Sequence, residues 1–271
     1  MKKVIFVPNI KSFRLFSNNN EKSLKAEELV REKLTKNNFI ESNNNYDLAI
    51  AIGGDGSFLR MVKNSNFNSD VLYVGINVGT LGFAQEVSLD SIDEFIEELK
   101  NDNYKVDSIG VQETKVVTKD ADSNFYSLNE IVVRQKELNT VVLDVKIEDI
   151  FLENFVGDGL LVATSFGSTA YNLSFGGSMV YNTFHTLQLT PIAPLNNKSY
   201  RTLMNSVILP ENKVITLIPT RNKNLLINID GENKCYEGVL YIETVVNKKR
   251  IKCLRRKDYD FSKKINEKFL R

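Results

Sequence analysis

Apolar and polar residues follow two different periods along the first hundred residues of the chain. Three short apolar runs are typical of buried strands: 3–7, 47–52 and 71–76. Between and after them, apolar side chains recur at the spacing of a helix face, at Ala26, Leu29, Val30 and Leu34, and at Ile92, Phe95, Ile96 and Leu99. Ser91 and Glu94 fit a capping box for the second helix. Strands separated by helices predict a parallel sheet covered on both faces.

From about residue 105 the chain is rich in Val, Ile, Thr and Tyr, often in alternation with polar residues, which predicts strands. The predicted strands are 114–118, 125–134, 140–148, 159–164, 207–209, 213–219, 224–230, 239–246 and 249–254. Asp158-Gly159 and Asp230-Gly231 are turn signals between them. The pattern predicts an antiparallel, sandwich-like domain. A helix is expected within it at 168–177, and another in the tail at 258–271.

Charge and composition exclude several classes of protein. Lys and Arg number 35 and Asp and Glu 34, so the net charge of +1 argues against a broad nucleic-acid-binding surface. No apolar run approaches the roughly 18 residues that a membrane span needs. Cys235 and Cys253 have no metal-site spacing, and two free thiols fit a reducing cytoplasm. The sequence has no cluster of His and Cys residues that would indicate a zinc site. Any metal should therefore be a hard cation such as Mg²⁺ with oxygen ligands.

The sharpest local motif is Gly53-Gly54-Asp55-Gly56, directly after the predicted strand 47–52. Ligands bind beyond the carboxyl ends of strands in an open α/β sheet, and glycines let the backbone approach a phosphate. The motif is neither a Walker A loop nor a dinucleotide fingerprint. Asp55 fits a carboxylate that accepts a proton from an attacking hydroxyl or helps to hold Mg²⁺. The alternative is a tight turn in which Asp55 bonds its own backbone.

Two further segments combine polar groups with apolar surroundings. In 157–177, the hydroxyls of Ser165, Ser168 and Thr169 can bind phosphate or ribose oxygens, and Tyr171 can face a base; a helix cap is the alternative. Asn129-Glu130 is a polar pair inside a strand-like run, and it fits either a sugar or base contact or an exposed strand edge. The single histidine, His185, has no nucleophile elbow beside it and is expected in a loop.

Taken in order, these segments resemble the NAD kinase family over nearly the whole chain. The matching stretches are GGDGSFLR, GINVGTLGF, LNE, GDGLLVATSFGSTAYNLSFGG, PIAPLNNKSYRTL and NIDGE. GGDG alone is weak, because diacylglycerol and sphingosine kinases carry similar loops, whereas DGLLVATSFGSTAY together with LNE is specific. The short N-terminus and PIAPLNN are similar to compact Firmicute-type or mycoplasma-type members.

The resemblance implies a role for each matching residue. Asp55 would accept the proton of the ribose 2′-hydroxyl, and Phe83 would pack near the adenine. Asp158 would contact the nicotinamide end, and Asp230 matches a ligand-side aspartate of some members. The other implied substrate-binding residues are Gly53, Gly54, Gly56, Asn129, Glu130, Ser168, Thr169, Ala170, Tyr171, Ser174 and Ala193.

The chain departs from the family pattern at two positions. Val156 stands where many relatives have a basic residue, so one contact of that side chain is lost. Phe166 stands where a proline is common, which changes the shape of the loop. The family also implies homodimers or homotetramers, Mg²⁺ or another divalent cation as cofactor, and ATP or polyphosphate as the phosphoryl donor.

The sequence thus predicts an NAD kinase with the fold shared by NAD and diacylglycerol kinases. An α/β nucleotide-binding domain is expected at 1–108, with 255–271 packing back on it, and a β-rich NAD-binding domain at 109–254. The substrates would be the small molecules NAD and ATP, with no nucleic acid and no membrane involved. A lipid kinase with the same loop and a non-catalytic nucleotide sensor are the alternatives. The first would need a wide apolar pocket, and the second would have no need of Asp55.

Overall fold

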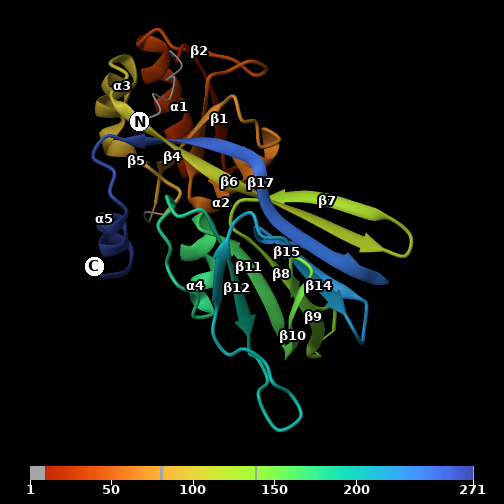
Figure 1. The fold of residues 1–271 in the computed structure, drawn as a ribbon. Coiled ribbons are helices and arrows are strands. Elements are labelled where there is room, and N and C mark those ends of the chain that lie inside the picture. The colour runs from red at the N-terminus through yellow and green to blue at the C-terminus, as the bar shows by residue number, and fades with distance from the viewer. Residues whose placement is uncertain (1–9, 80–81, 138, 271) are drawn as a thin grey trace. The chain divides into compact units, whose positions relative to one another are not determined.

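The structure, a computed structural model, describes residues 10–79, 82–137 and 139–270 and divides into two compact units (Figure 1). The first unit comprises Met1–Ile109 and Arg250–Arg271, and the second Gly110–Lys249. Two long strands, β6 (Tyr104–Thr118) and β17 (Val239–Arg256), have residues in both. The predicted strand at 3–7 lies outside the described residues.

A parallel sheet forms the first unit, in the order β2-β1-β3-β4, and both β5 and the end of β17 pair with β4. Its other strands are β1 (Ser12–Ser17), β2 (Ile40–Glu41), β3 (Leu48–Gly53), β4 (Leu72–Asn77) and β5 (Val87–Ser88). The helices are α1 (Glu21–Lys36), α2 (Asp55–Asn64), α3 (Ile92–Lys100) after a 3-10 turn at Leu89–Ser91, and α5 (Phe261–Ile265), followed by a π-helical turn at Asn266–Leu270. The predicted alternation of strand and helix is confirmed. The pattern does not predict β1, because Arg14 interrupts its apolar residues.

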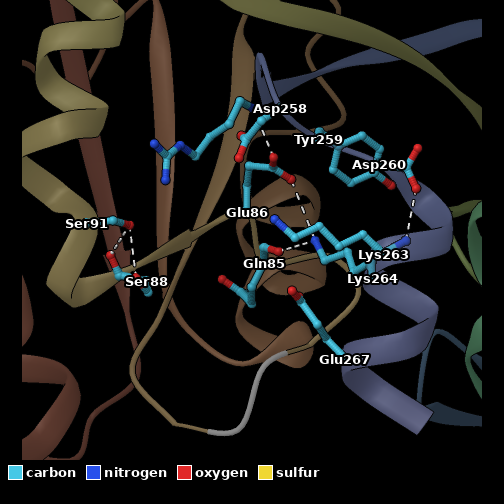
Figure 2. A pocket seen from close by; sticks show the side chains of 11 residues that line it. Gln85, Glu86, Ser88, Ser91, Asp258, Tyr259, Asp260, Lys263, Lys264 and Glu267 are labelled. Atoms are coloured by element: carbon cyan, nitrogen blue, oxygen red, sulfur yellow. Dashed lines mark hydrogen bonds and ion pairs between the residues drawn. The ribbon is translucent and has the colours of Figure 1, made fainter. Parts of the chain in front are cut away.

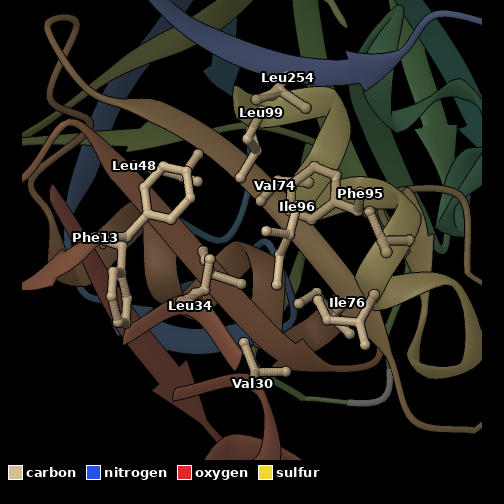
Figure 3. Packing of buried hydrophobic residues seen from close by; sticks show 14 of the residues in the cluster. Phe13, Val30, Leu34, Leu48, Val74, Ile76, Phe95, Ile96, Leu99 and Leu254 are labelled. Carbon is tan, nitrogen blue, oxygen red and sulfur yellow. The ribbon is translucent and has the colours of Figure 1, made fainter. Parts of the chain in front are cut away.

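Alternation along β3 explains how helices cover this sheet. Leu48, Ile50 and Ile52 pack with apolar residues of α1 and α3 in one buried cluster (Figure 3). Ala49 and Ala51 point to the opposite face, because successive side chains of a strand alternate. The Tyr73 hydroxyl, on the neighbouring strand, lies 2.6 Å from the hydroxyl of Ser65 at the end of α2. Small side chains therefore let α2 pack closely, and its first residue, Asp55, follows the carboxyl end of β3.

The predicted capping box at the start of α3 is wrong. Ser91 precedes the helix but makes no side-chain cap, and its hydroxyl donates to the Ser88 carbonyl at 3.1 Å. The reason is the 3-10 turn, which gives Ser91 a ψ of 16° in place of the extended conformation that a capping serine adopts.

Two sheets pack face to face in the second unit, which confirms the predicted β-rich fold. One is antiparallel, in the order β13-β12-β11-β8-β15-β16. The other contains β10-β9-β14 and the first part of β17, with β6 and β7. Apolar residues of both sheets share one buried cluster. The strands are β7 (Asp122–Ser127), β8 (Glu130–Gln135), β9 (Val141–Ile147), β10 (Ile150–Gly157), β11 (Gly159–Thr164), β12 (Thr186–Ile192), β13 (Val207–Pro210), β14 (Ile215–Pro219), β15 (Leu225–Ile229) and β16 (Glu232–Tyr236).

The structure differs from the prediction at 168–177, where no single helix forms. A 3-10 turn (Phe166–Thr169) and the one-turn helix α4 (Tyr171–Ser174) are separated by Ala170, whose ψ is −133°. Gly167 lies so close to the backbone of Asn129 that a Cβ would be 2.1 Å from its carbonyl oxygen. This close packing holds Gly167 within the 3-10 turn, and the non-helical ψ of Ala170 interrupts the predicted helix. The sequence also does not predict strands β10 and β16, in which polar or charged residues interrupt the apolar ones, or strand β12, which contains Pro191.

Candidate functional site

The glycine loop connects β3 to α2 and leaves the amino end of that helix open. Gly53 has a φ of +145°, and a Cβ there would lie 2.3 Å from the hydroxyl oxygen of Ser57. Glycine is therefore required at position 53. A Cβ on Gly54 would meet nothing within 4 Å, and one on Gly56 nothing nearer than 3.5 Å. The space beside the α-carbons of Gly54 and Gly56 is thus unobstructed, which leaves room for a phosphate at the amino end of α2.

Asp55 makes contacts that neither alternative reading of the sequence predicts. Its Oδ2 accepts the backbone N–H of Phe83 and its Oδ1 that of Ala84, both at 3.0 Å. A Cβ on Gly82 would lie 1.9 Å from Oδ1, so only glycine fits against the carboxylate. Asp55 is therefore not a turn residue that bonds its own backbone. Each oxygen of an ionised carboxylate has two lone pairs, so both oxygens keep a lone pair for a substrate hydroxyl.

The side chain of Phe83 lies against other aromatic residues of the first unit. Its ring centroid is 5.9 Å from that of Phe261 and 5.4 Å from that of Phe269. These contacts connect the segment that holds Asp55 to the C-terminal helix. The expected contact of Phe83 with an adenine stays a prediction.

In the second unit, Asp230 holds the segment that contains Asn129 and Glu130. Asp230 and Gly231, which the sequence predicts as a turn, form the two-residue hairpin turn between β15 and β16, and both have positive φ. The Asp230 carboxylate accepts the backbone N–H groups of Leu128, Asn129 and Glu130 at 2.7, 2.8 and 3.2 Å. The Asp230 carboxylate oxygens thus bind backbone N–H groups, and Asp230 thereby positions Leu128, Asn129 and Glu130. The side-chain amide of Asn129 is half-exposed and makes no hydrogen bond with any described residue.

Glu130 lines a pocket of about 400 Å³ in this unit. Its side chain is 4% exposed, and Oε2 has no hydrogen-bond partner among the described residues. Burial, with a smaller contribution from the Asp230 carboxylate, raises the pKa of Glu130 to about 8, although the Tyr171 backbone N–H opposes this. A carboxyl in this state is protonated at neutral pH and can donate to a ligand. The other residues that line the pocket are Val132, Arg134, Tyr171, Leu226, Asn228, Gly231 and Asn233.

Sequence reasoning missed three polar residues of this pocket: Arg134, Asn228 and Asn233. Arg134 lies 3.3 Å from the Tyr171 hydroxyl, and its buried Nε has no partner among the described residues. Asn228 donates to the side chain of Asn233 at 2.9 Å. The only signal in the sequence was a polar residue, Arg134 or Asn228, within a largely apolar stretch, which also fits an exposed strand face.

The hydroxyl-rich segment has a mixed role. Ser168 is fully buried, and its hydroxyl both accepts from the backbone N–H of Val180 and donates to its carbonyl, so this predicted binding residue supports the fold. Thr169 and Ala170 are half-buried, whereas Tyr171 and Ser174 are exposed. Only Tyr171 of this group lines the pocket of Glu130. Asn172, which the sequence did not indicate, is fully buried and bonds both the Ser168 carbonyl and Thr190.

Asp158 and Ala193 lie beside each other at the end of the β11–β12 pair. The Asp158 N–H donates to the carbonyl of Ile192 at 3.0 Å, and both Asp158 and Ala193 are exposed. Ala193 has a φ of +44°, which turns the chain away from the sheet. Val156, the departure from the family pattern, is buried in β10 and presents no polar group.

The first unit contains a second pocket, of about 300 Å³, that the sequence did not predict (Figure 2). It is lined by residues of the segment 85–91 and of the C-terminal segment 256–267. Among the described residues there is no group of three or more His, Cys, Asp or Glu side chains that could hold a metal ion. None of the described helices is long and apolar enough to cross a membrane.

Replacing Glu130 by Gln should remove part of the pH dependence of stability. The raised pKa means that the folded chain keeps this proton up to about pH 8, whereas the ordinary value is 4.5. Between these values the folded state binds more protons than the unfolded state, so the free energy of unfolding decreases as pH rises. Urea unfolding at about pH 5 and about pH 8 should therefore show a smaller difference for Glu130→Gln than for the unsubstituted chain.

Glu137→Gln provides the control, because it makes the same change at an exposed position. Its pH dependence should match that of the unsubstituted chain. An equally steep decrease in Glu130→Gln would contradict a proton held by Glu130.

Comparison with known proteins identifies the family. Residues 9–104 match the ATP-NAD kinase N-terminal domain, and 128–248 match the ATP-NAD kinase C-terminal domain. The chain is 40% identical over 243 residues to the NAD kinase of Finegoldia magna, covering 86% of this chain and 89% of the relative. It is 34% identical over 243 residues to the NAD kinase of Streptococcus gordonii, covering 89% and 88%.

Two solved structures share the fold. One is yeast NADH kinase complexed with NADH, with a TM-score of 0.82 and 23% identity, covering 97% of this chain and 88% of that one. The other is an NAD kinase from Archaeoglobus fulgidus in complex with ATP, with a TM-score of 0.76 and 19% identity, covering 94% and 98%. The predicted fold class is thus confirmed. From both domain matches and from relatives that align along most of its length, the chain belongs to the ATP-NAD kinase family.

Proposed function

We propose that this chain transfers the terminal phosphoryl group of ATP to the 2′-hydroxyl of the adenosine ribose of NAD, which gives NADP and ADP. Membership of the ATP-NAD kinase family supports the reaction. The observation that carries the assignment of the base is the environment of Asp55. Two backbone N–H groups fix its carboxylate at the amino end of α2, between Gly54 and Gly56, whose α-carbons have unobstructed space beside them.

Each part of this loop has a distinct task in the proposed reaction. An oxygen of Asp55 takes the proton of the 2′-hydroxyl while the hydroxyl oxygen attacks the γ-phosphorus. The bond from this phosphorus to the oxygen bridging the β-phosphate breaks, and ADP leaves. The N–H groups at the start of α2 offer positive ends of peptide dipoles to the phosphates. Positioning and charge neutralisation are the main requirements of phosphoryl transfer, so the chain needs no other reactive group.

A divalent cation, Mg²⁺ in our proposal, fits these residues if phosphate and water supply most of its ligands. The described residues offer no cluster of three carboxylate, imidazole or thiolate groups, and Asp55 already accepts two N–H groups. Mg²⁺ is commonly bound through substrate phosphates and water with few protein ligands. When bound it would neutralise charge on the phosphoryl oxygens.

The pocket of Glu130 is the part of the second unit that we propose binds a polar group of NAD. Glu130 can donate a proton in a hydrogen bond, and Asn228 and Asn233 line the same pocket. The buried carboxyl group of Glu130 in this lining does not suit the acyl chain of a lipid substrate. A non-catalytic sensor would have no need of Asp55. Asn129, Asp158, Thr169, Ala170, Ser174 and Ala193 remain proposed contacts. Homodimers or homotetramers, a cytoplasmic location and the use of polyphosphate as donor also belong to the proposal.

Asp55→Asn should lower kcat by ~10²–10⁴ and leave NAD affinity nearly unchanged, because it removes the proton acceptor at constant size. Asparagine also has only one acceptor oxygen, so thermal unfolding should be measured alongside turnover. Asp70→Asn makes the same change at an exposed position of the first unit and should behave like the unsubstituted chain. Near-normal turnover of Asp55→Asn would exclude Asp55 as the base.

Asn129→Ala should raise the KM for NAD, because a ligand group would lose its partner in the site. The expected loss of binding free energy for NAD is about 1–3 kcal/mol. Since Asp230 binds the backbone of residue 129, the segment should keep its position in this variant. Steady-state kinetics with NAD and ATP varied in turn would test this. An effect on the KM for ATP alone would show that Asn129 serves the phosphoryl donor.

Removal of divalent cations should abolish activity without unfolding the protein. The purified chain should contain no stoichiometric metal, and EDTA should leave its Tm unchanged. A cation that binds only together with ATP cannot stabilise the free protein. Activity should return with Mg²⁺ or Mn²⁺. Full turnover in EDTA, or one tightly bound zinc ion per chain by elemental analysis, would contradict the proposed chemistry.

A further inference from the structure

The segment from Phe83 to Glu86 lies between Asp55 and the C-terminal part of the first unit. On one side, the N–H groups of Phe83 and Ala84 donate to Asp55, and the Glu86 N–H donates to the Gly75 carbonyl of β4 at 2.8 Å. These bonds are made by the backbone of a short non-helical stretch. The position of the Asp55 carboxylate therefore depends on what holds this stretch from the other side.

Lys264 of α5 is the residue that holds it there. Its Nζ donates to the Gln85 carbonyl and lies 3.6 Å from the Glu86 carboxylate (Figure 2). Lys264 is 7% exposed, so its ammonium group binds these acceptors in place of water. Gln85 follows Ala84 directly in the chain. One bond of Lys264 thus fixes the residue next to a donor of Asp55.

The ammonium group of Lys264 belongs to a buried network of charged side chains. The Arg255 guanidinium lies 3.3 Å from Glu86 and 3.2 Å from Asp107, and the Tyr259 ring lies 5.4 Å from Lys264 Nζ. Burial, followed by the charge of Arg255, lowers the pKa of Lys264 to about 8, while the carboxylates of Glu86 and Asp55 oppose this change. Lys264 and Asp55 are thus close enough to interact electrostatically. An apolar side chain would avoid the desolvation cost of the ammonium group, but it would leave the Gln85 carbonyl without this donor.

We propose that Lys264 is a positioning residue for Asp55, acting by fixing Gln85 and Glu86 so that the preceding two N–H groups hold the catalytic carboxylate. This inference rests on the proposed function, in which Asp55 is the base. Lys264 touches no reacting atom in it. Its contribution is the orientation of Asp55, so it should affect kcat and leave substrate binding nearly unchanged.

The test compares three variants of the full-length chain. Lys264→Met keeps the length of the side chain and removes the ammonium group. Lys264→Arg keeps a positive donor, and Lys263→Met makes the same change on an exposed residue of the same helix. We expect Lys264→Met to lower kcat by roughly 10- to 100-fold, the scale for a misplaced catalytic group, with KM values for NAD and ATP within about twofold. Lys264→Arg should recover most of the rate, and Lys263→Met should match the unsubstituted chain.

Amide hydrogen exchange of Phe83 and Ala84 gives a readout that does not depend on activity. In Lys264→Met, exchange of these amides should become about tenfold faster, while the amides of β3 keep their protection. Combining Lys264→Met with Asp55→Asn should add little to the loss of rate caused by Asp55→Asn alone, because both act through one carboxylate.

Each outcome separates the inference from the proposed function. Unchanged kcat in a folded Lys264→Met variant, or unchanged exchange of Phe83 and Ala84, would overturn the positioning role even if Asp55→Asn is inactive. A global loss of protection and a lowered Tm with raised KM values would show that Lys264 supports the fold only, and would also overturn it. If Asp55→Asn keeps its activity, the proposed base is wrong. Faster exchange of the two amides in Lys264→Met would then still establish the contact made by Lys264.

Discussion

The hydrogen bonds from the Phe83 and Ala84 amides to Asp55 join the two segments on which the chemistry of the first unit depends. One segment is the glycine loop, which brings backbone N–H groups to the end of β3. The other is the stretch after Gly82, which contacts the C-terminal residues in two ways. The Phe83 ring packs on aromatic rings of that segment, and the Gln85 carbonyl accepts a hydrogen bond from Lys264. An ionised carboxylate bound by two backbone donors has a fixed orientation. A general base needs this, because proton transfer occurs only within hydrogen-bonding reach.

The second unit uses the same interaction at a different place. Asp230 starts a hairpin turn, and its carboxylate binds three consecutive N–H groups at the start of β8. Here the aspartate positions its neighbours, since Glu130 is thereby directed into the pocket. Glu130 Oε2 has no hydrogen-bond partner among the described residues, whereas both oxygens of Asp230 accept backbone N–H groups. The ligand-side role expected for Asp230 stays a prediction, beside its observed role in holding these residues.

Both candidate sites contain a buried ionisable group that costs stability. Burial raises the pKa of Glu130 and lowers that of Lys264, so each charge is disfavoured by its surroundings. Groups of this kind concentrate at functional sites, because binding and catalysis need polar atoms where folding alone would exclude them.

The sequence by itself determined the features that depend on neighbours in the chain. Apolar periodicity located β3, β4, α1 and α3, and the glycine motif directly after the strand 47–52 placed Asp55 beyond the carboxyl end of β3. Asp230-Gly231 identified a turn, which the structure shows to be a two-residue hairpin turn with positive φ at both residues. The motifs also identified the family, because the identity and order of such residues do not require knowledge of their contacts.

Only the tertiary structure decided what each of these residues touches. Asp55 bonds residues 28 and 29 positions away, and Lys264 bonds one 179 positions away, distances over which no local pattern carries information. The same applies to Ser168, whose hydroxyl bonds the backbone of Val180, and to 168–177, where the conformation of Ala170 interrupts the helical pattern. Strand and helix preferences act within a few residues, whereas a buried polar group binds whichever partner the folded chain brings to it.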